Sequence, residues 1–374
     1  MKVIFLTNIP MIRQHRIDMY VDTIAENYDI ELWDLSPIYG NNEVLQSMEQ
    51  ESVKINNLEF FNEKLKEEVL KDRVVVVTNI LIYNLKFIYP FIHALGIPII
   101  NISKESMGAW IYNVSAINHR KMIGFTRYLK ALMHHNPITR RILNYYHNGI
   151  VKYDYQLASY NFFPEENRHF IKIHNVKYDE FIGAQEEKSI IDGEYILFID
   201  AAIVDHPMFN NRENKIDRNV YLNQLNHYFM LLEKKYNIPV VISAHPKSCY
   251  SNTDFKGRKI IMYKTPVLIR HAKYIIAHYS TSLYDSILQR KPIKVMYSYE
   301  LVHTAAYTAV LPGMQVAEFV GAEKVNLNNP ALNDFTVSEC LYSKFANMYI
   351  LNKNKTNYRN KDLILDFFNG LNSK

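Results

Sequence analysis

Two segments in the C-terminal half carry residue types that can bind a phosphate group. The first is Val240–Lys247 (VVISAHPK), an apolar strand pattern that ends at Ala244 and is followed by His245, Pro246 and Lys247. Ligands of open α/β sheets bind beyond the carboxyl ends of the strands. At that edge a histidine and a lysine can hydrogen-bond a phosphate, and a proline stiffens the turn. The alternative interpretation is an ordinary turn with a surface histidine.

The second segment is Tyr274–Val295 (YIIAHYSTSLYDSILQRKPIKV), in which an apolar strand is followed by the hydroxyl residues Ser280, Thr281 and Ser282. A helix is expected to begin at Ser282. Hydroxyls and free backbone N–H groups at a helix N-terminus favour anions. A plain N-cap would account for one hydroxyl but less well for three. Because both segments follow strands of one expected domain, we predict that they form two walls of one phosphate pocket.

Candidate catalytic carboxylates lie in Tyr195–Pro207 (YILFIDAAIVDHP), where Asp200 directly follows an apolar strand. A carboxylate in this place can act as a general base on an acceptor hydroxyl, which gives inversion. It can instead attack the anomeric carbon, which gives retention through a covalent adduct. Asp205, in the loop that follows, is the second candidate, and His245 completes the catalytic set. The structural alternative for Asp200 is a carboxylate that caps its own loop.

In the N-terminal half, the segment Asn8–Arg16 (NIPMIRQHR) follows the first strand and has polar side chains that could line an acceptor site. The candidates are Asn8, Arg13, His15 and Arg16. The alternative is that these residues form the polar face of a first helix.

Three further predictions concern the donor pocket and metals. His278 and Glu300 lie near the proposed pocket in sequence, and Glu300 is placed to bind ribose hydroxyls. We expect no catalytic metal, because no Asp-x-Asp motif follows a strand. His134 and His135 have no partner at ligand spacing.

Short apolar runs alternate with amphipathic stretches, which predicts parallel sheets covered by helices on both faces. Two such series occur, and we predict two Rossmann-like domains over residues 1–182 and 195–350, joined near Gly183–Glu194. Residues 351–374 are expected to form a C-terminal helix that could pack back on the N-terminal domain. The expected strands are Lys2–Thr7, Ile30–Leu35, Val74–Thr78, Ile97–Ile102, Tyr195–Ile199, Pro239–Ala244, Lys259–Tyr263, Tyr274–Ala277 and Pro292–Tyr297, and the longer expected helices are Ile12–Asn27, Leu58–Leu70, Leu81–Leu95, Val220–Tyr236 and Tyr358–Leu371.

Composition is that of a globular protein, with 48% hydrophobic and 22% charged residues among 374. Two distant cysteines favour a reducing cytoplasm, and no stretch is typical of a signal peptide or a membrane span. Residues 117–147 hold six Lys or Arg and no acid. They form either a solvated helix face or a surface for an anionic membrane or glycan. A nucleic-acid partner is not expected, since no binding motif is present.

The His245-Pro246 pair, the later Ser280–Ser282 helix start and the strand after Lys291-Pro292 resemble bacterial glycosyltransferases of the GT-B class that use CMP-activated ulosonic acids. These are the sialyltransferases and the Kdo and pseudaminic acid transferases of capsule and lipopolysaccharide assembly. The resemblance covers mainly residues 195–300.

This resemblance implies two Rossmann-like domains with a cleft between them. It also implies a CMP-sugar as co-substrate without another cofactor, and a surface glycan or lipid-linked glycan as acceptor. His245 and Ser280–Ser282 would hold the CMP phosphate, aided by a protonated imidazole. Asp200 matches the nucleophile of retaining Kdo transferases. The alternatives are a transferase or epimerase that uses a UDP- or GDP-hexose, or a non-catalytic glycan- or nucleotide-binding protein.

Overall fold

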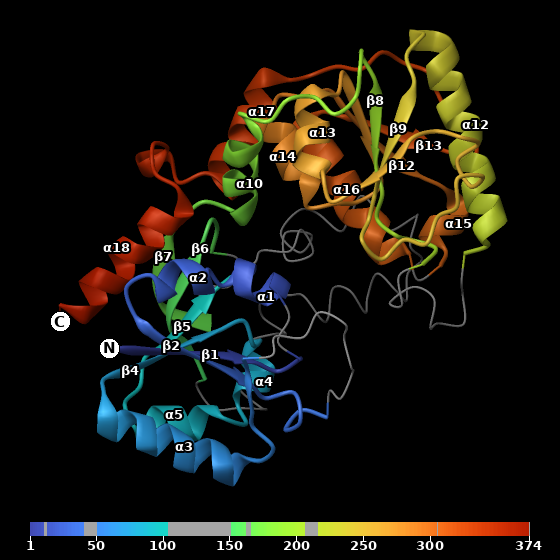
Figure 1. Cartoon of the computed structure of the whole chain (residues 1–374). Coiled ribbons are helices and arrows are strands. Elements are labelled where there is room, and N and C mark those ends of the chain that lie inside the picture. Colours follow the sequence, from blue (N-terminus) through green and yellow to red (C-terminus); the bar gives the residue numbers. More distant parts are fainter. Residues whose placement is uncertain are drawn as a thin grey trace. The chain divides into compact units, whose positions relative to one another are not determined.

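The computed structural model contains two α/β units, each built around a parallel sheet (Figure 1). It describes residues 1–10, 13–40, 51–103, 151–161, 166–205, 216–304 and 306–373. The first unit comprises described residues within Met1–Glu105, His135–Val176 and Leu351–Lys374, and the second comprises those within Lys177–Ile350. Across these ranges, no helix combines the length and the apolar character that crossing a bilayer requires.

The sheet of the first unit has the strand order β3-β2-β1-β4-β5-β6-β7, and every pair is parallel. The order reverses at β1, as in Rossmann folds. The strands are β1 (Lys2–Thr7), β2 (Asp29–Asp34), β3 (Val53–Lys54), β4 (Val74–Thr78), β5 (Ile99–Ile102), β6 (Tyr153–Ala158) and β7 (Asn167–Lys172). The helices are α1 (Arg13–Asp18), α2 (Val21–Ala25), α3 (Leu58–Lys71), α4 (Ile82–Leu85), α5 (Tyr89–Ala94) and α18 (Asn360–Asn372).

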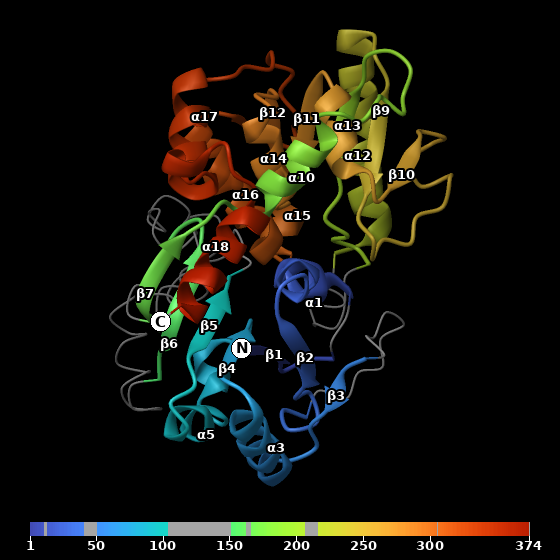
Figure 2. The ribbon, with the colours of Figure 1, turned by 60° about the vertical axis from the view of Figure 1, so that its left-hand side comes forward.

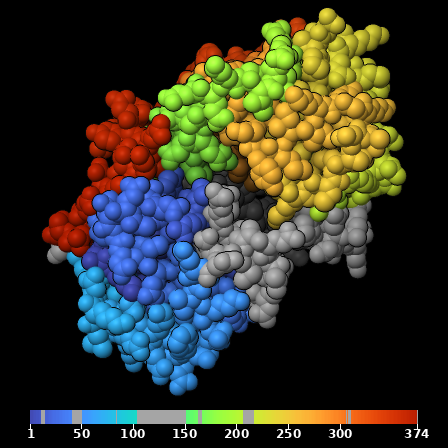
Figure 3. Space-filling model, viewed as in Figure 1, coloured from blue at the N-terminus to red at the C-terminus, as the bar shows by residue number. Residues whose placement is uncertain are grey.

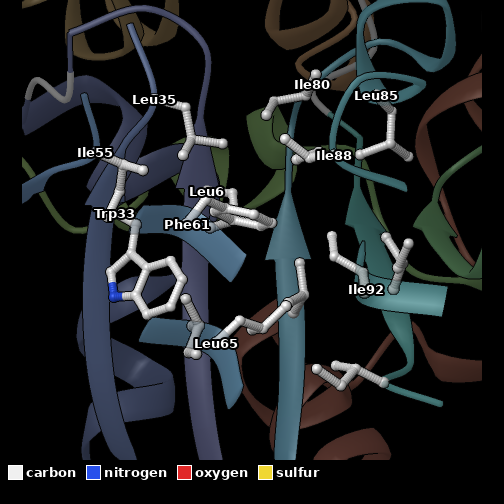
Figure 4. Close-up of a cluster of buried hydrophobic side chains, with 14 of the residues drawn as sticks. Leu6, Trp33, Leu35, Ile55, Phe61, Leu65, Ile80, Leu85, Ile88 and Ile92 are labelled. Atoms are coloured by element: carbon white, nitrogen blue, oxygen red, sulfur yellow. The ribbon is translucent and has the colours of Figure 1, made fainter. Parts of the chain in front are cut away.

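Alternate residues of β1 enter two different hydrophobic clusters, because successive side chains of a strand point to opposite faces. Ile4 and Leu6 pack with residues of α3, α4 and α5 on one face, where the rings of Trp33 and Phe61 meet edge to face (Figure 4). Val3 and Phe5 pack on the other face with α2 and α18. The sheet is thus covered on both sides, as its continuous apolar strands require.

Helix α18 is fixed to the first unit although it comes from the end of the chain (Figure 2). Its residues Ile364 and Phe368 are fully buried in the cluster that contains Val3 and Phe5. At its start, the buried side chain of Asn360 accepts a hydrogen bond from the backbone N–H of His174 (2.8 Å). The first unit therefore contains segments from both ends of the sequence.

The sheet of the second unit has the order β10-β9-β8-β11-β12-β13, again parallel throughout. Three aromatic rings, Phe198, Phe229 and Phe255, pack together between β8 and α12. The strands are β8 (Ile196–Ile199), β9 (Val240–Ala244), β10 (Ile260–Met262), β11 (Tyr274–Ala277), β12 (Ile293–Tyr297) and β13 (Glu323–Asn326). The helices are α10 (Val176–Ala184), α12 (Arg218–Tyr236), α13 (Thr265–His271), α14 (Ser282–Leu288), α15 (Tyr299–Val302), α16 (Tyr307–Val320) and α17 (Glu339–Phe345), followed by a π-helix (Ala346–Ile350). A 3₁₀-helix (Lys353–Lys355) comes next and already belongs to the first unit.

The predicted fold class is confirmed, because each unit has the Rossmann-like strand order expected of the GT-B class. One predicted helix, Ile12–Asn27, is divided into α1 and α2, since Tyr20 takes a left-handed conformation (φ 55°) that ends regular helix. The chain passes from the first unit to the second at Val176 and Lys177, ahead of the expected linker Gly183–Glu194.

Candidate functional site

The sequence-predicted residues of the second unit gather at the carboxyl edge of its sheet. In the β8 register, Ile199 pairs with Ser243 of β9 and with Ala277 of β11. The residues that follow these three strands therefore leave the sheet at one edge. The chain runs from β8 outward to β10 and then returns to β11, so β8 and β11 flank the point where the strand order reverses. Ligands of doubly wound sheets bind at that point.

Asp200, directly after β8, is 3% exposed and its two carboxylate oxygens accept four hydrogen bonds. Oδ1 accepts from the backbone N–H of Ala202 (3.1 Å) and from the hydroxyl of Tyr250 (3.0 Å). Oδ2 accepts from the backbone N–H of His245 (3.1 Å) and from the hydroxyl of Ser248 (2.5 Å). Because both carboxylate oxygens of Asp200 already accept hydrogen bonds, this geometry favours a structural role. Asp200 would anchor the loop after β9 rather than act as the predicted nucleophile or base.

Asp205, the second candidate carboxylate, belongs to an ion-pair network. Its Oδ1 accepts from Arg218 at the start of α12 (2.6 Å), and its Oδ2 accepts from the backbone N–H of Cys249 (2.8 Å). Arg218 also donates to Asp254 (2.9 Å) and lies over the ring of Tyr250. The network links the loop after β8 to the loop after β9. His206, which follows Asp205, lies outside the described residues.

His245 is half-buried, and burial lowers the pKa of its imidazole, partly offset by the negative charge of Asp200. The ring nitrogen Nδ1 accepts a hydrogen bond from the backbone N–H of Lys247 (3.1 Å), so the proton of the neutral ring is on Nε2. The expected protonated imidazole is therefore not the form that the free protein favours. His245 is instead placed as a neutral hydrogen-bond donor, while Pro246 and Lys247 are exposed beside it.

The three hydroxyl residues lie at the turn between β11 and α14, and all three are half-buried. Ser280 Oγ accepts a hydrogen bond from the backbone N–H of Ser282 (3.1 Å), which is the capping role that the alternative interpretation assigned to one hydroxyl. Thr281 is the N-cap residue and its side chain makes no cap hydrogen bond. A polar turn therefore follows β11 at the same sheet edge as His245 and Asp200.

His278 is a correction to the predicted donor site, because its side chain is fully buried. Its Nδ1 donates to the carbonyl oxygen of Met296 (2.8 Å), and its ring packs against Phe198 and Tyr221. Burial lowers the pKa of the imidazole to about 4, so the ring is neutral at physiological pH. A fully buried, neutral ring cannot contact a nucleotide from this position. The ring of His278 instead packs in the core under the carboxyl edge of the sheet.

Glu300, at the start of α15, is a half-buried carboxylate held in place by two amides. It accepts hydrogen bonds from Gln224 (3.0 Å) and from Asn328 (2.9 Å to each oxygen). Burial acts to raise the pKa of Glu300, but these hydrogen bonds outweigh it and lower the pKa to about 2. The carboxylate is therefore ionised at neutral pH. Glu300 lies after β12, the strand next to β11 in the sheet. Its predicted contact with ribose hydroxyls stays a prediction.

The proposed acceptor residues lie in the first unit, after β1 and on α1. Asn8 is half-buried, and His15 is 8% exposed. Arg16 Nε donates to Asp22 (2.6 Å), and the side chain of Arg13 lies outside the described residues. The ion pair of Arg16 agrees with the polar face of a helix, whereas His15 is buried and Asn8 precedes α1. Acceptor binding by these residues stays a prediction. The basic segment 117–147 also lies outside the described residues.

Asp285 on α14 is a buried acid that the sequence analysis did not single out, because D in the pattern STSLYDSIL looks like an ordinary helix residue. It is 1% exposed. Oδ1 accepts from Gln289 (2.7 Å), and Oδ2 has no partner among the described residues. Burial raises the pKa of Asp285 to about 7, aided by the charge of Glu180 and opposed by Gln289 and Lys177.

Asp285→Asn is expected to stabilise the protein more at alkaline than at acidic pH. The unfolded carboxyl ionises at its ordinary pKa of 3.8, whereas the folded one ionises at about 7. Between these values ionisation increasingly favours the unfolded state, and above them the penalty is constant. We expect a gain of about 1–4 kcal/mol in the free energy of unfolding near pH 8 and a small change near pH 4. Urea unfolding at both pH values measures it, with exposed Asp192→Asn as the control. A pH-independent difference would contradict the raised pKa.

Within the described ranges, no group of three or more His, Cys, Asp or Glu side chains is arranged to hold a metal ion. A metal-independent reaction stays a prediction. Two cavities, of about 410 and 320 Å³, lie at the amino edges of the two sheets and include none of the predicted site residues.

No protein-family model matches this sequence, and no curated protein matches it. Solved structures align along nearly the whole chain at low identity. Apo UGT2 of Phytolacca americana is 9% identical over 98% of this chain and 93% of its own, with a TM-score of 0.48. The UDP-GlcNAc 2-epimerase of Methanocaldococcus jannaschii is 12% identical over 98% and 99%, with a TM-score of 0.47. The spinosyn forosaminyltransferase SpnP is 9% identical over 100% of both chains, with a TM-score of 0.45. Similarities at this level do not identify the reaction of this chain.

Proposed function

We propose that this protein is a nucleotide-sugar enzyme, a glycosyltransferase or epimerase, that binds its donor at the carboxyl edge of the second sheet. The single observation that carries the proposal is the convergence of His245, the Ser280–Ser282 turn and Glu300 on that edge, around the reversal of strand order between β8 and β11. Each group suits one part of a nucleotide. The hydroxyl turn and the His245 Nε2–H would donate to phosphate, and the ionised Glu300 would accept from ribose hydroxyls.

A UDP- or GDP-hexose is the first candidate donor. Burial disfavours the protonated form of His245, which removes one of the arguments that the sequence analysis gives for a CMP-activated donor. A neutral Nε2–H can still donate to either phosphate of a diphosphate. A CMP-activated ulosonic acid is the second candidate, because the His-Pro, Ser-Thr-Ser and Lys-Pro segments resemble those of the CMP-sugar transferases.

Calorimetric titration of the full chain with UDP, GDP and CMP separates these candidates. We expect UDP or GDP to bind and CMP to bind more weakly. Preferential binding of CMP would shift the assignment to the ulosonic acid transferases. Failure of all three nucleotides to bind would contradict the proposed site.

Turnover decides between the two kinds of enzyme and the non-catalytic alternative. A transferase releases free nucleotide only when an acceptor is supplied. An epimerase changes the sugar of the intact nucleotide sugar without an acceptor, and NMR of the sugar ring reports that change. Saturable nucleotide binding with neither change would favour a binding protein.

His245→Ala should weaken nucleotide binding by about 1–3 kcal/mol, or roughly 5–150-fold, through loss of one phosphate donor. The backbone N–H of His245 remains, so its hydrogen bond to Asp200 and the loop position should persist. His227→Ala, an exposed histidine of α12, is the matched control and should bind as the wild type does. Equal affinity of the two variants would remove His245 from the pocket.

A further inference from the structure

A cavity of about 410 Å³ lies at the amino edge of the second sheet, away from the nucleotide site proposed above. Its walls come from α10, from the end of α13 and from the turn after α14. The last two lead into β11 and β12, which places the cavity where these strands begin. In both ribbon views α10 lies beside α13 and α14 (Figures 1 and 2), and in Figure 3 the green segment that carries α10 is at the surface beside orange segments.

The cavity concentrates positive charge that has little compensation. Arg270, Arg290 and Lys291 line it together with His271, and none of the described residues that line it is acidic. Lys291 Nζ donates to two backbone carbonyls, those of Arg270 (2.6 Å) and Ala272 (2.8 Å), rather than to a carboxylate. Burial and the neighbouring charge of Arg270 lower the pKa of Lys291. Such a concentration of like charge attracts an anion.

The two guanidinium groups retain capacity for a ligand. Arg270 donates to the neutral side chain of Gln185. Arg290 donates to Ser343 (2.9 Å), and its Nε lies 3.4 Å from Glu339, whose side chain is 71% exposed. Its Nη1 is buried and has no hydrogen-bond partner among the described residues. Planar guanidinium forks bind phosphate with paired hydrogen bonds, and the volume suits a small molecule.

We propose that this cavity is a second binding site, for a small phosphate-bearing molecule held by Arg270, Arg290 and Lys291. It is distinct from the nucleotide site, because its walls share no residue with the carboxyl edge. A ligand there would bridge α10, α13 and α14 and would stabilise the second unit.

Inorganic pyrophosphate is the probe, titrated into the full chain by calorimetry at constant ionic strength. Arg270→Gln and Arg290→Gly should each weaken binding at least about tenfold. Arg290 has a left-handed backbone (φ 55°) that glycine adopts without strain, so Arg290→Gly removes the guanidinium while the turn keeps its conformation. Lys234→Gln, at an exposed cation of α12, is the charge-matched control and should bind as the wild type does.

Further outcomes separate this site from the nucleotide site. His245→Ala should leave pyrophosphate affinity unchanged, and the two arginine variants should leave UDP affinity unchanged. The proposal is overturned if pyrophosphate does not bind at millimolar concentration, if folded arginine variants bind it as tightly as Lys234→Gln does, or if His245→Ala is the variant that loses it.

Discussion

Asp200→Asn will destabilise the second unit by about 2–4 kcal/mol and will release the loop after β9. In the native protein both carboxylate oxygens accept hydrogen bonds, and three of the four donors, His245, Ser248 and Tyr250, belong to that loop. Asparagine replaces one acceptor oxygen with a donor NH₂ group. On either side one backbone N–H then faces another donor in a buried site, while the neighbouring hydroxyl has to turn to accept. The hydrogen bonds to a charged acceptor are lost as well.

Chemical denaturation measures the stability change, and nucleotide titration of the same variant measures the consequence for the site. We expect weaker nucleotide binding as well as lower stability, because the backbone N–H of His245 is held by the carboxylate of Asp200. Asp192→Asn, an exposed acid ahead of β8, should change neither quantity. A variant of normal stability and normal nucleotide affinity that has lost only turnover would instead restore Asp200 as the nucleophile or base.

Gly313→Ala will destabilise the second unit by about 3 kcal/mol or more, although alanine is the better helix former. Gly313 is buried in α16, and a Cβ added there would lie 1.8 Å from the carbonyl oxygen of His278. The obstacle is backbone, so no side-chain rotation can relieve it. Helix α16 would have to move away from β12 and from the segment that leads to Ser280.

The matched control is Gly183→Ala in α10, where an added Cβ meets no atom of the described residues within 4 Å. It should be neutral or should stabilise the protein by up to about 1 kcal/mol. Thermal and urea unfolding of both variants test the contrast. Equal stability of the two variants would show that α16 does not approach the backbone of His278, directly after β11, as closely as the structure places it.

The sequence predicts most strands of both units because their apolar runs are continuous. Lys2–Thr7, Val74–Thr78 and Tyr274–Ala277 are strands with the expected bounds. Less apolar strands escaped detection. In β7, Arg168, His169 and Lys172 interrupt the pattern, and β13 is the polar segment Glu323–Asn326. A strand at the edge of a sheet buries less of its surface, so its composition carries a weaker signal.

The sequence predicts where the candidate residues lie on the sheet, but not which of them are buried or already hydrogen-bonded. That His245 and Ser280 share a sheet edge follows from the parallel direction of their strands, which continuous apolar runs indicate. The burial of His278 depends on how α16 and α12 pack over this edge of the sheet. The four hydrogen bonds that the carboxylate of Asp200 accepts depend on the path of the loop that carries Tyr250. Such contacts join residues that are distant in sequence. A single sequence does not reveal them, and a polar residue after a strand reads as functional in either case.

A crystal structure of the full chain soaked with UDP tests the central claim most directly. We expect the phosphates within hydrogen-bond distance of the Ser280–Ser282 turn and His245 Nε2, and the ribose beside Glu300. Nucleotide density anywhere else on the chain, with this edge unoccupied at saturating UDP, would contradict the proposed donor site.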